Sequence, residues 1–248
     1  MRVDVERLKT YIKKATLNYS LESLQIILTK ERVCSRMAAP QGKYVILLEI
    51  DNDIFKDVPV ATEYKFNFIE PNQNLLPFLN LIDDDETILI VDDEKLTFKN
   101  GSQKSSVFFC SSTVVSIFGL TAPRAGIEYF VQIPFNTEFS SYFNKIKKIG
   151  MKFGKVYFSV KDSVLLLEST DKLNRLSNGI SFNIQSVDSI DLSLCFDFKD
   201  ISNLLAVLNG DVDDFVFNLA YLSDKKLGMI YIHNVSETEK YYLMSYLE

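Results

Sequence analysis

The sequence of 248 residues holds one histidine and three cysteines, and it lacks the short motifs of common active sites. It contains no G-x-G-x-x-G, no G-x-x-x-x-G-K-[ST] and no H-E-x-x-H. His233 lies in the strand-like run 229–233 without the glycines of a nucleophile elbow, which argues against a Ser-His-Asp triad. These absences disfavour an enzyme, so we predict no catalytic residue, no metal site and no cofactor.

Cysteine usage and hydropathy bear on the compartment. Cys34, Cys110 and Cys195 are widely spaced and lie in strand-like sequence, as expected of reduced packing residues in a cytoplasmic protein. No apolar run approaches the ~20 residues that a membrane-spanning helix needs. The first residues, 1–7, alternate in charge and lack the apolar stretch of a secretion signal. We therefore expect a cytoplasmic protein with no membrane partner.

What the sequence does contain is an internal repeat. Residues 74–80 read N-L-L-P-F-L-N, and residues 203–209 read N-L-L-A-V-L-N. Each copy follows a strand that ends in F-x-F, at 66–68 and 196–198, and precedes an acidic turn and another strand. The same order of elements half a chain apart indicates duplication. A chain of this length also accommodates two domains of ordinary size.

The sequence pattern of each half predicts a helix, three or four strands, a second helix and three strands. The first helix, residues 5–17, has apolar residues at helical spacing on one face. In the second half a helix begins near Thr137, a residue type that caps helix N-termini. The two apolar stripes comprise Val5, Leu8, Ile12 and Ala15 in the first helix, and Phe139, Tyr142, Phe143, Ile146 and Ile149 in the second.

The two N-L-L helices should differ in regularity. Proline costs roughly 3 kcal/mol inside a helix but is tolerated in the first turn. The helix that contains Pro77 is therefore expected to begin near Asn74 and to be short, whereas the copy with Ala206 should be regular. The predicted fold class is α+β, with two tandem domains of two helices on antiparallel sheets. The domains span 1–110 and 127–248, and an interdomain connector spans 111–126.

Charge is unevenly distributed in this chain of net charge −6. Residues 5–18 hold one acidic and four basic residues, and residues 137–152 repeat that ratio. Basic residues on one helix face neutralise phosphates without reading bases. We therefore predict sequence-independent attraction to nucleic acid, with an ordinary solvated helix face as the alternative. The candidate DNA-facing residues are Arg7, Lys13, Lys14, Lys145, Lys147 and Lys148.

The acidic clusters offer another chemistry, because carboxylates can hold divalent cations. The plainer interpretation is that they are polar turns between strands, since two of them follow matched helices. The clusters are Asp51–Asp53, Asp83–Glu86, Asp92–Glu94 and Asp211–Asp214.

Tandem α+β domains, basic helices in an acidic chain and a long connector together resemble DNA polymerase sliding clamps, which are processivity factors. At this length the sequence is most similar to the trimeric clamps of T-even bacteriophages. The resemblance covers the whole chain in order and spacing. It implies a homotrimeric ring around duplex DNA that holds a DNA polymerase and is opened by an ATP-dependent clamp loader. It also implies a bacteriophage protein in the cytoplasm of its host cell.

The resemblance assigns two further surfaces. Edge strands join neighbouring subunits in the family, which by position implies 103–110 of one chain and 179–185 of the next. A pocket beside the connector receives short apolar peptides of polymerase and loader, although the same residues could simply seal the two cores. That pocket would comprise Val115, Ile117, Phe118, Leu120, Leu243 and Tyr246.

Two other functions remain open. One is a clamp-like processivity factor that works as a monomer or dimer through direct electrostatic binding, which predicts a steep salt dependence on linear DNA. The other is a metal-dependent nuclease that uses the aspartate clusters.

Overall fold

The computed structural model divides into two compact units, one formed by residues 1–120 with 238–240 and the other by 121–237 with 241–248. The predicted boundaries around the connector 111–126 stay a prediction, because most of that segment lies outside the described residues. The structure describes residues 1–39, 43–60, 62–82, 87–111, 113, 129–171, 178–188, 190, 192–208, 214–222 and 227–245.

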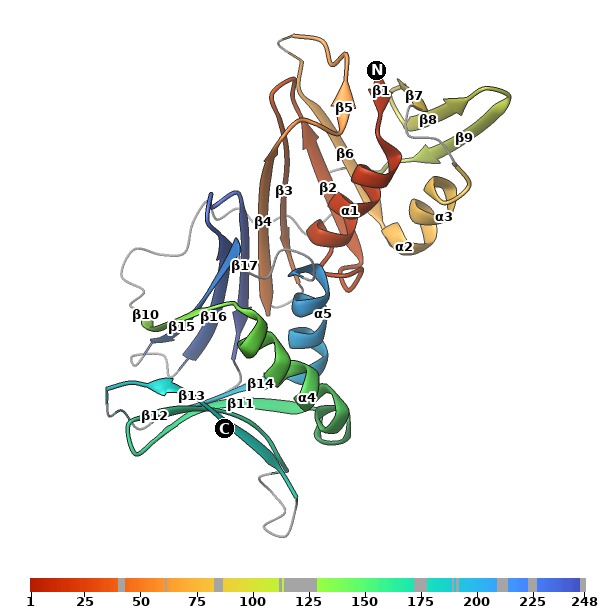
Figure 1. Ribbon diagram of the computed structural model, residues 1–248. Coiled ribbons are helices and arrows are strands. Elements are labelled where there is room, and N and C mark those ends of the chain that lie inside the picture. The colour runs from red at the N-terminus through yellow and green to blue at the C-terminus, as the bar shows by residue number, and fades with distance from the viewer. Residues whose placement is uncertain are drawn as a thin grey trace. The chain divides into compact units, whose positions relative to one another are not determined.

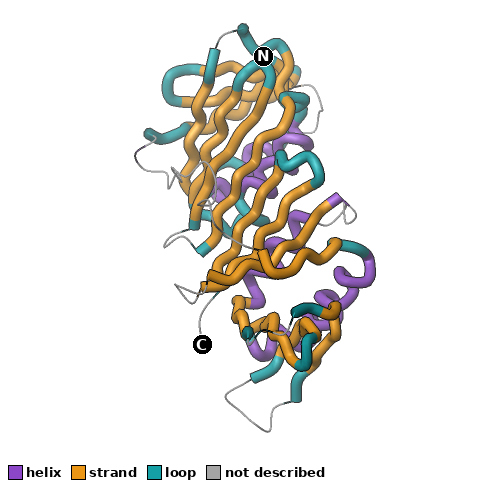
Figure 2. Tube along the Cα trace, turned by 90° about the vertical axis from the view of Figure 1, so that its left-hand side faces the viewer, coloured by secondary structure: helices purple, strands orange, loops and turns teal. Residues whose placement is uncertain are grey.

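The first unit carries its helices on antiparallel sheets, and Figure 2 shows its strands side by side with helices on one side of them. The helices are α1 (Val5–Ala15), α2 (Pro71–Asn74) and α3 (Leu76–Leu79). One sheet has the order β5 (Phe55–Lys56), β1 (Arg2–Val3), β7 (Thr87–Val91), β8 (Lys95–Asn100), β9 (Gln103–Phe108). The other strands follow the order β4 (Tyr44–Asp51), β3 (Arg32–Ala38), β2 (Ser23–Leu28), β6 (Tyr64–Ile69).

The second unit is built in the same way around α4 (Thr137–Phe153) and α5 (Phe198–Leu208). One set of strands has the order β10 (Tyr129–Pro134), β15 (Phe215–Leu222), β16 (Leu227–Asn234), β17 (Glu239–Met244). The other sheet has the order β13 (Ile180–Ser186), β12 (Val164–Ser169), β11 (Lys155–Lys161), β14 (Ser193–Asp197). The predicted α+β class, with helices packed on antiparallel sheets in two tandem domains, is confirmed.

The strand orders show the duplication directly. In the first unit β1, β7, β8 and β9 neighbour one another in the same order as β10, β15, β16 and β17 in the second. Likewise β4-β3-β2-β6 matches β13-β12-β11-β14. Among the described strands only the two-residue β5 has no counterpart. Apart from β5, each described strand of one unit therefore has an equivalent strand in the other.

The leucines of the N-L-L repeat pack the second helix of each unit against the core. Leu75 and its equivalent Leu204 are buried, as are Leu79 and its equivalent Leu208. These pairs lie one helical turn apart on one face, where burial of each leucine stabilises the fold by roughly 1.5–3 kcal/mol. The second leucine of each copy is only half-buried. Duplication thus kept the leucines that face the sheet.

Proline breaks the first copy of this helix. The segment divides at Leu75 into two single turns, and Pro77 lies in the first turn of α3, where its missing N–H has no partner to lose. The helix that contains Pro77, α3, is short and begins at Leu76, close to the expected start near Asn74, whereas the separate turn α2 from Pro71 was not predicted. The expectation for the second copy is confirmed, since α5 runs unbroken through Ala206.

Cysteine positions agree with the prediction in two cases out of three. All three thiols are free. Cys34 lies in β3 and Cys195 in β14, whereas Cys110 lies beyond the end of β9, where its thiol donates to the Asn67 carbonyl. No helix in the described part of the chain is long and apolar enough to span a membrane.

Exchange of residues between equivalent repeat positions should expose the difference between the two helices. We expect Pro77→Ala to change the free energy of unfolding by less than about 1 kcal/mol, because a first-turn proline costs little. Ala206→Pro should cost about 3 kcal/mol or more, since it removes an internal hydrogen bond and clashes with the preceding turn. Urea denaturation measures both. Equal costs for the two variants would contradict the assignment of a regular α5.

Candidate nucleic-acid interface

Helix α1 is fixed by its cap and by its apolar face. The Asp4 side chain accepts a hydrogen bond of 3.0 Å from the Arg7 amide, which satisfies one of the free N–H groups at the helix start. The Tyr11 hydroxyl donates to Ser35 Oγ (2.8 Å) inside the core. The predicted stripe of Val5, Leu8, Ile12 and Ala15 is buried. The basic residues of α1 therefore lie on its remaining faces.

Helix α4 is its structural equivalent, but its cap differs from the prediction. Asn136 Oδ1, not Thr137, accepts a hydrogen bond from the Phe139 amide (2.8 Å), and the Asn136 carbonyl accepts from Ser140. Asparagine is as good a cap as threonine, so sequence alone did not separate the two neighbours. Phe139, Phe143 and Ile146 are buried, as predicted, while Tyr142 is only half-buried.

Each first helix lies beside the second helix of its own unit. Helix α1 contacts α3, and α4 contacts α5, as Figure 1 shows for the second unit. On the sheet side, α1 packs on β3 and β4, and α4 packs on the equivalent β12 and β13 as well as on β11. The two basic helices therefore occupy equivalent places in the duplicated fold.

Two of the three predicted cations of α1 are held by carboxylates of the same unit. Lys14 Nζ lies 2.6 Å from Glu239 Oε1 at the start of β17. The Arg7 guanidinium contacts Asp53 and also lies 3.3 Å from Asp4 Oδ2. Sequence reasoning missed both distant partners, because they are separated from α1 along the chain and carry no local pattern.

The other cations are not paired in this way. Lys147 and Lys148 are exposed on α4, and Lys13 is half-exposed on α1. Within the part of the chain that the structure describes, no carboxylate forms an ion pair with any of these three lysines. Their charges are therefore available to an external anion.

Lys145 lies instead against two aromatic rings. Its Nζ is 5.7 Å from the centroid of Tyr142 and 5.6 Å from that of Phe182 in β13, within reach of a cation–π attraction. The two rings stack 4.7 Å apart. The Tyr142 hydroxyl donates to Glu138 (2.6 Å), and this carboxylate raises the pKa of the phenol. This assembly is absent from the sequence prediction, which placed Tyr142 in the core stripe.

The predicted partner pocket falls almost entirely outside the described residues. Only Leu243 belongs to them, and it is buried in β17. The remaining members, Val115, Ile117, Phe118, Leu120 and Tyr246, lie outside the residues that the structure describes.

The acidic clusters are only partly described. Asp53 faces Arg7, whereas 83–86 and 211–213 lie outside the described residues. Among the residues described, no group of three or more His, Cys, Asp and Glu side chains has the arrangement of a metal site.

No protein-family model and no curated protein matches the sequence, but solved structures match its fold. The PCNA of A. fulgidus, bound to the C-terminal region of FEN-1, has TM-score 0.66 and 16% identity over 100% of this chain and 98% of that chain. The PCNA2–PCNA3 complex of Sulfolobus tokodaii gives 0.63 and 15%, with 100% of both chains covered. A DNA polymerase sliding clamp from Pseudomonas aeruginosa gives 0.67 and 12% over 100% of this chain and 66% of that one. The chain therefore has the sliding-clamp fold along its whole length.

The lysines of α4 generate a direct prediction. Replacement of Lys145, Lys147 and Lys148 by Gln should weaken binding to duplex DNA equally for all sequences. The slope of log K against log salt should become shallower by about 0.9 for each lost phosphate contact. Fluorescence anisotropy with a short labelled duplex at several salt concentrations measures this slope. As a control, Lys56, Lys65 and Lys161 replaced by Gln remove the same charge elsewhere and should leave the slope unchanged. An equal effect of the two triple variants would contradict the assignment of α4.

Proposed function

We propose that this protein is a sliding clamp: a non-catalytic ring of three identical chains that encircles duplex DNA and tethers the replicative DNA polymerase. An ATP-dependent clamp loader opens the ring. The matched fold over the whole chain and the unpaired lysines of α4 support the proposal. A bacteriophage source and a location in the host-cell cytoplasm belong to the same proposal, on the resemblance to the trimeric phage clamps.

One observation carries the ring: the neighbouring strands β17 and β4 have equivalents, β9 and β13, that do not pair with each other in the described part of the chain. The start of β17 belongs to the first unit and borders β4, where the Glu49 amide donates to the Thr238 carbonyl (2.8 Å). The strands equivalent to β17 and β4 are β9 and β13. Both stand at the outer edge of their sheets among the described strands. The same pairing between β9 of one chain and β13 of the next satisfies both edges and repeats head to tail.

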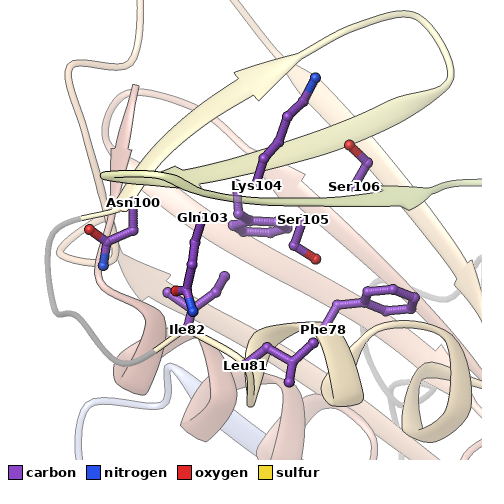
Figure 3. A pocket seen from close by; sticks show the side chains of 9 residues that line it. Phe78, Leu81, Ile82, Asn100, Gln103, Lys104, Ser105 and Ser106 are labelled. Carbon is purple, nitrogen blue, oxygen red and sulfur yellow. The ribbon is translucent and has the colours of Figure 1, made fainter.

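A cavity of about 340 Å³ lies beside β9 and supports this pairing. Figure 3 shows Phe78, Leu81 and Ile82 on one side of it, with Gln103 and Ser105 pointing toward them from β9. Leu81 is 63% exposed, although it is a large apolar side chain. The Ser105 hydroxyl is buried without a hydrogen-bond partner among the described residues. A neighbouring chain would cover the apolar side chains and supply the missing partner.

The opposite edge carries matching apolar surface. Phe182 projects from β13 and stacks on Tyr142 of α4, and both rings are partly exposed. In the proposed ring this aromatic pair of one chain packs into the cavity beside β9 of the next. Aromatic side chains contribute strongly to protein interfaces because they bury a large area with few rotatable bonds.

Partner binding follows from the comparisons by analogy alone. The archaeal PCNA structure holds the C-terminal region of another protein, FEN-1. We propose that peptides of the polymerase and the loader bind this chain in a similar way, at Val115, Ile117, Phe118, Leu120, Leu243 and Tyr246.

The mass of the assembly tests the ring. Sedimentation equilibrium at micromolar concentration should give three times the 28.4 kDa chain mass. Leu81→Arg should lower it toward one chain, because a charge is then buried in the interface. Val60→Arg is the matched control: Val60 is also exposed (71%), belongs to the same unit and follows β5, at the other end of the sheet from β9, so the mass should stay unchanged. A monomeric wild-type protein would contradict the proposed ring.

Dependence on DNA ends tests encirclement. After loading by an ATP-dependent clamp loader, the protein should stay on a nicked circular plasmid at high salt and leave once the plasmid is cut. A monomeric or dimeric factor held by electrostatic attraction would leave both forms alike as salt rises. Equal release from circular and cut DNA as salt rises would therefore favour that second candidate. Metal-dependent cleavage of the plasmid would favour the nuclease.

A further inference from the structure

The ion pair between Lys14 and Glu239 is well removed from solvent. The Lys14 side chain is 20% exposed and that of Glu239 is 11% exposed, and a hydrogen bond of 2.6 Å joins them. A phosphate that competed for Lys14 would have to break this bond and leave a buried carboxylate without its counterion, which is strongly unfavourable. Lys14 is thus committed to a partner within its own unit.

The pair of Arg7 and Asp53 is a looser version of the same arrangement. Both side chains are more than half exposed, at 55% and 58%. Asp4 adds a second carboxylate beside the guanidinium. Solvent screens such a pair, so a phosphate competes for Arg7 more easily than for Lys14.

Both pairs border a single cavity of about 210 Å³ between α1 and β4. Leu48 and Ile50 of β4 form its apolar wall, while Arg7, Lys14, Asp53 and Glu239 form its polar rim. The two cations and these carboxylates, with Asp4 beside Arg7, therefore form one local group of opposite charges on α1, the helix equivalent to α4.

We propose that Glu239 and Asp53 are positioning residues that act as internal counterions, withdrawing Lys14 and Arg7 from duplex phosphate. The phosphate attraction of each chain then comes chiefly from α4. This inference rests on the proposed sliding clamp and divides the six predicted DNA-facing residues by their partners. In the proposed ring, α1 would therefore attract duplex phosphate less strongly than α4.

Removal of the carboxylate charge tests this assignment. In anisotropy titrations with a short blunt duplex, Glu239→Gln should steepen the slope of log K against log salt by about 0.9, the value for one added phosphate contact. Between about 50 and 200 mM salt its affinity should therefore fall by about 3.5-fold more than that of the wild type. Asp53→Asn should steepen the slope by less, because Asp4 remains beside Arg7.

Two comparisons separate released attraction from a mere change of net charge. Glu63→Gln neutralises the acid of the exposed Lys65–Glu63 pair on the same unit and should leave the slope unchanged. The double variant Lys14→Gln/Glu239→Gln should return to the wild-type slope, because the released cation is gone. A slope change that is shared by Glu63→Gln, or that survives in the double variant, would overturn the inference.

Failure of this inference can be told apart from failure of the proposed function. In one outcome, the triple α4 variant loses salt-dependent binding while Glu239→Gln and Asp53→Asn keep the wild-type slope. That result would support the DNA-facing assignment of α4 and contradict only the counterion role. If the α4 variant binds as the wild type does, the DNA-facing assignment itself is wrong. Thermal melting shows whether each variant remains folded. If Glu239→Gln unfolds, the exposed Asp53→Asn still tests the counterion role.

Discussion

The need to pair the backbone groups at sheet edges is the constraint on which this structure depends. Buried N–H and C=O groups require partners, and an exposed edge is a template for uncontrolled association. In the first unit, β4 is bordered by the start of β17 through the Glu49 amide. The equivalent strands β9 and β13 have no such neighbour among the described residues. The proposed assembly therefore follows from the duplication, because β9 and β13 correspond to a pair of strands that already neighbour each other within the chain.

The two repeats share their buried residues but differ in the polar faces of their helices. The equivalent leucines Leu75 and Leu204 are both buried, since cores tolerate little change in volume. The polar faces of the equivalent helices α1 and α4 differ in their contacts. Thus Lys14 gained a carboxylate partner, while Lys145 lies over aromatic rings. Two helices with the same number of basic residues therefore present different electrostatic surfaces.

Periodicity predicted the fold class, the helix order and the buried stripes, because these depend on local spacing. It missed β1 and β5, which have two residues each and are too short to show a pattern. The turn that starts at Pro71 and the cap at Asn136 depend on local competition between similar residues. The partner of Lys14 lies 225 residues away along the chain, so only the tertiary fold brings the two charges together. Charge counts therefore predicted the basic helices but not which of their cations are free.

Unequal attraction of the two helix types to DNA would suit the proposed ring, because such a ring holds the duplex by encircling it. Retention by encirclement needs little affinity, whereas every phosphate contact must be broken for the ring to move along the duplex. Each such contact also steepens the salt dependence of binding. A cation with an internal counterion still supports the helix and its packing but contributes less to that resistance. In the proposed ring, the lysines of α4 would supply most of the attraction to the duplex. The carboxylate partners of Arg7 and Lys14 on α1 would keep that attraction weak enough for sliding.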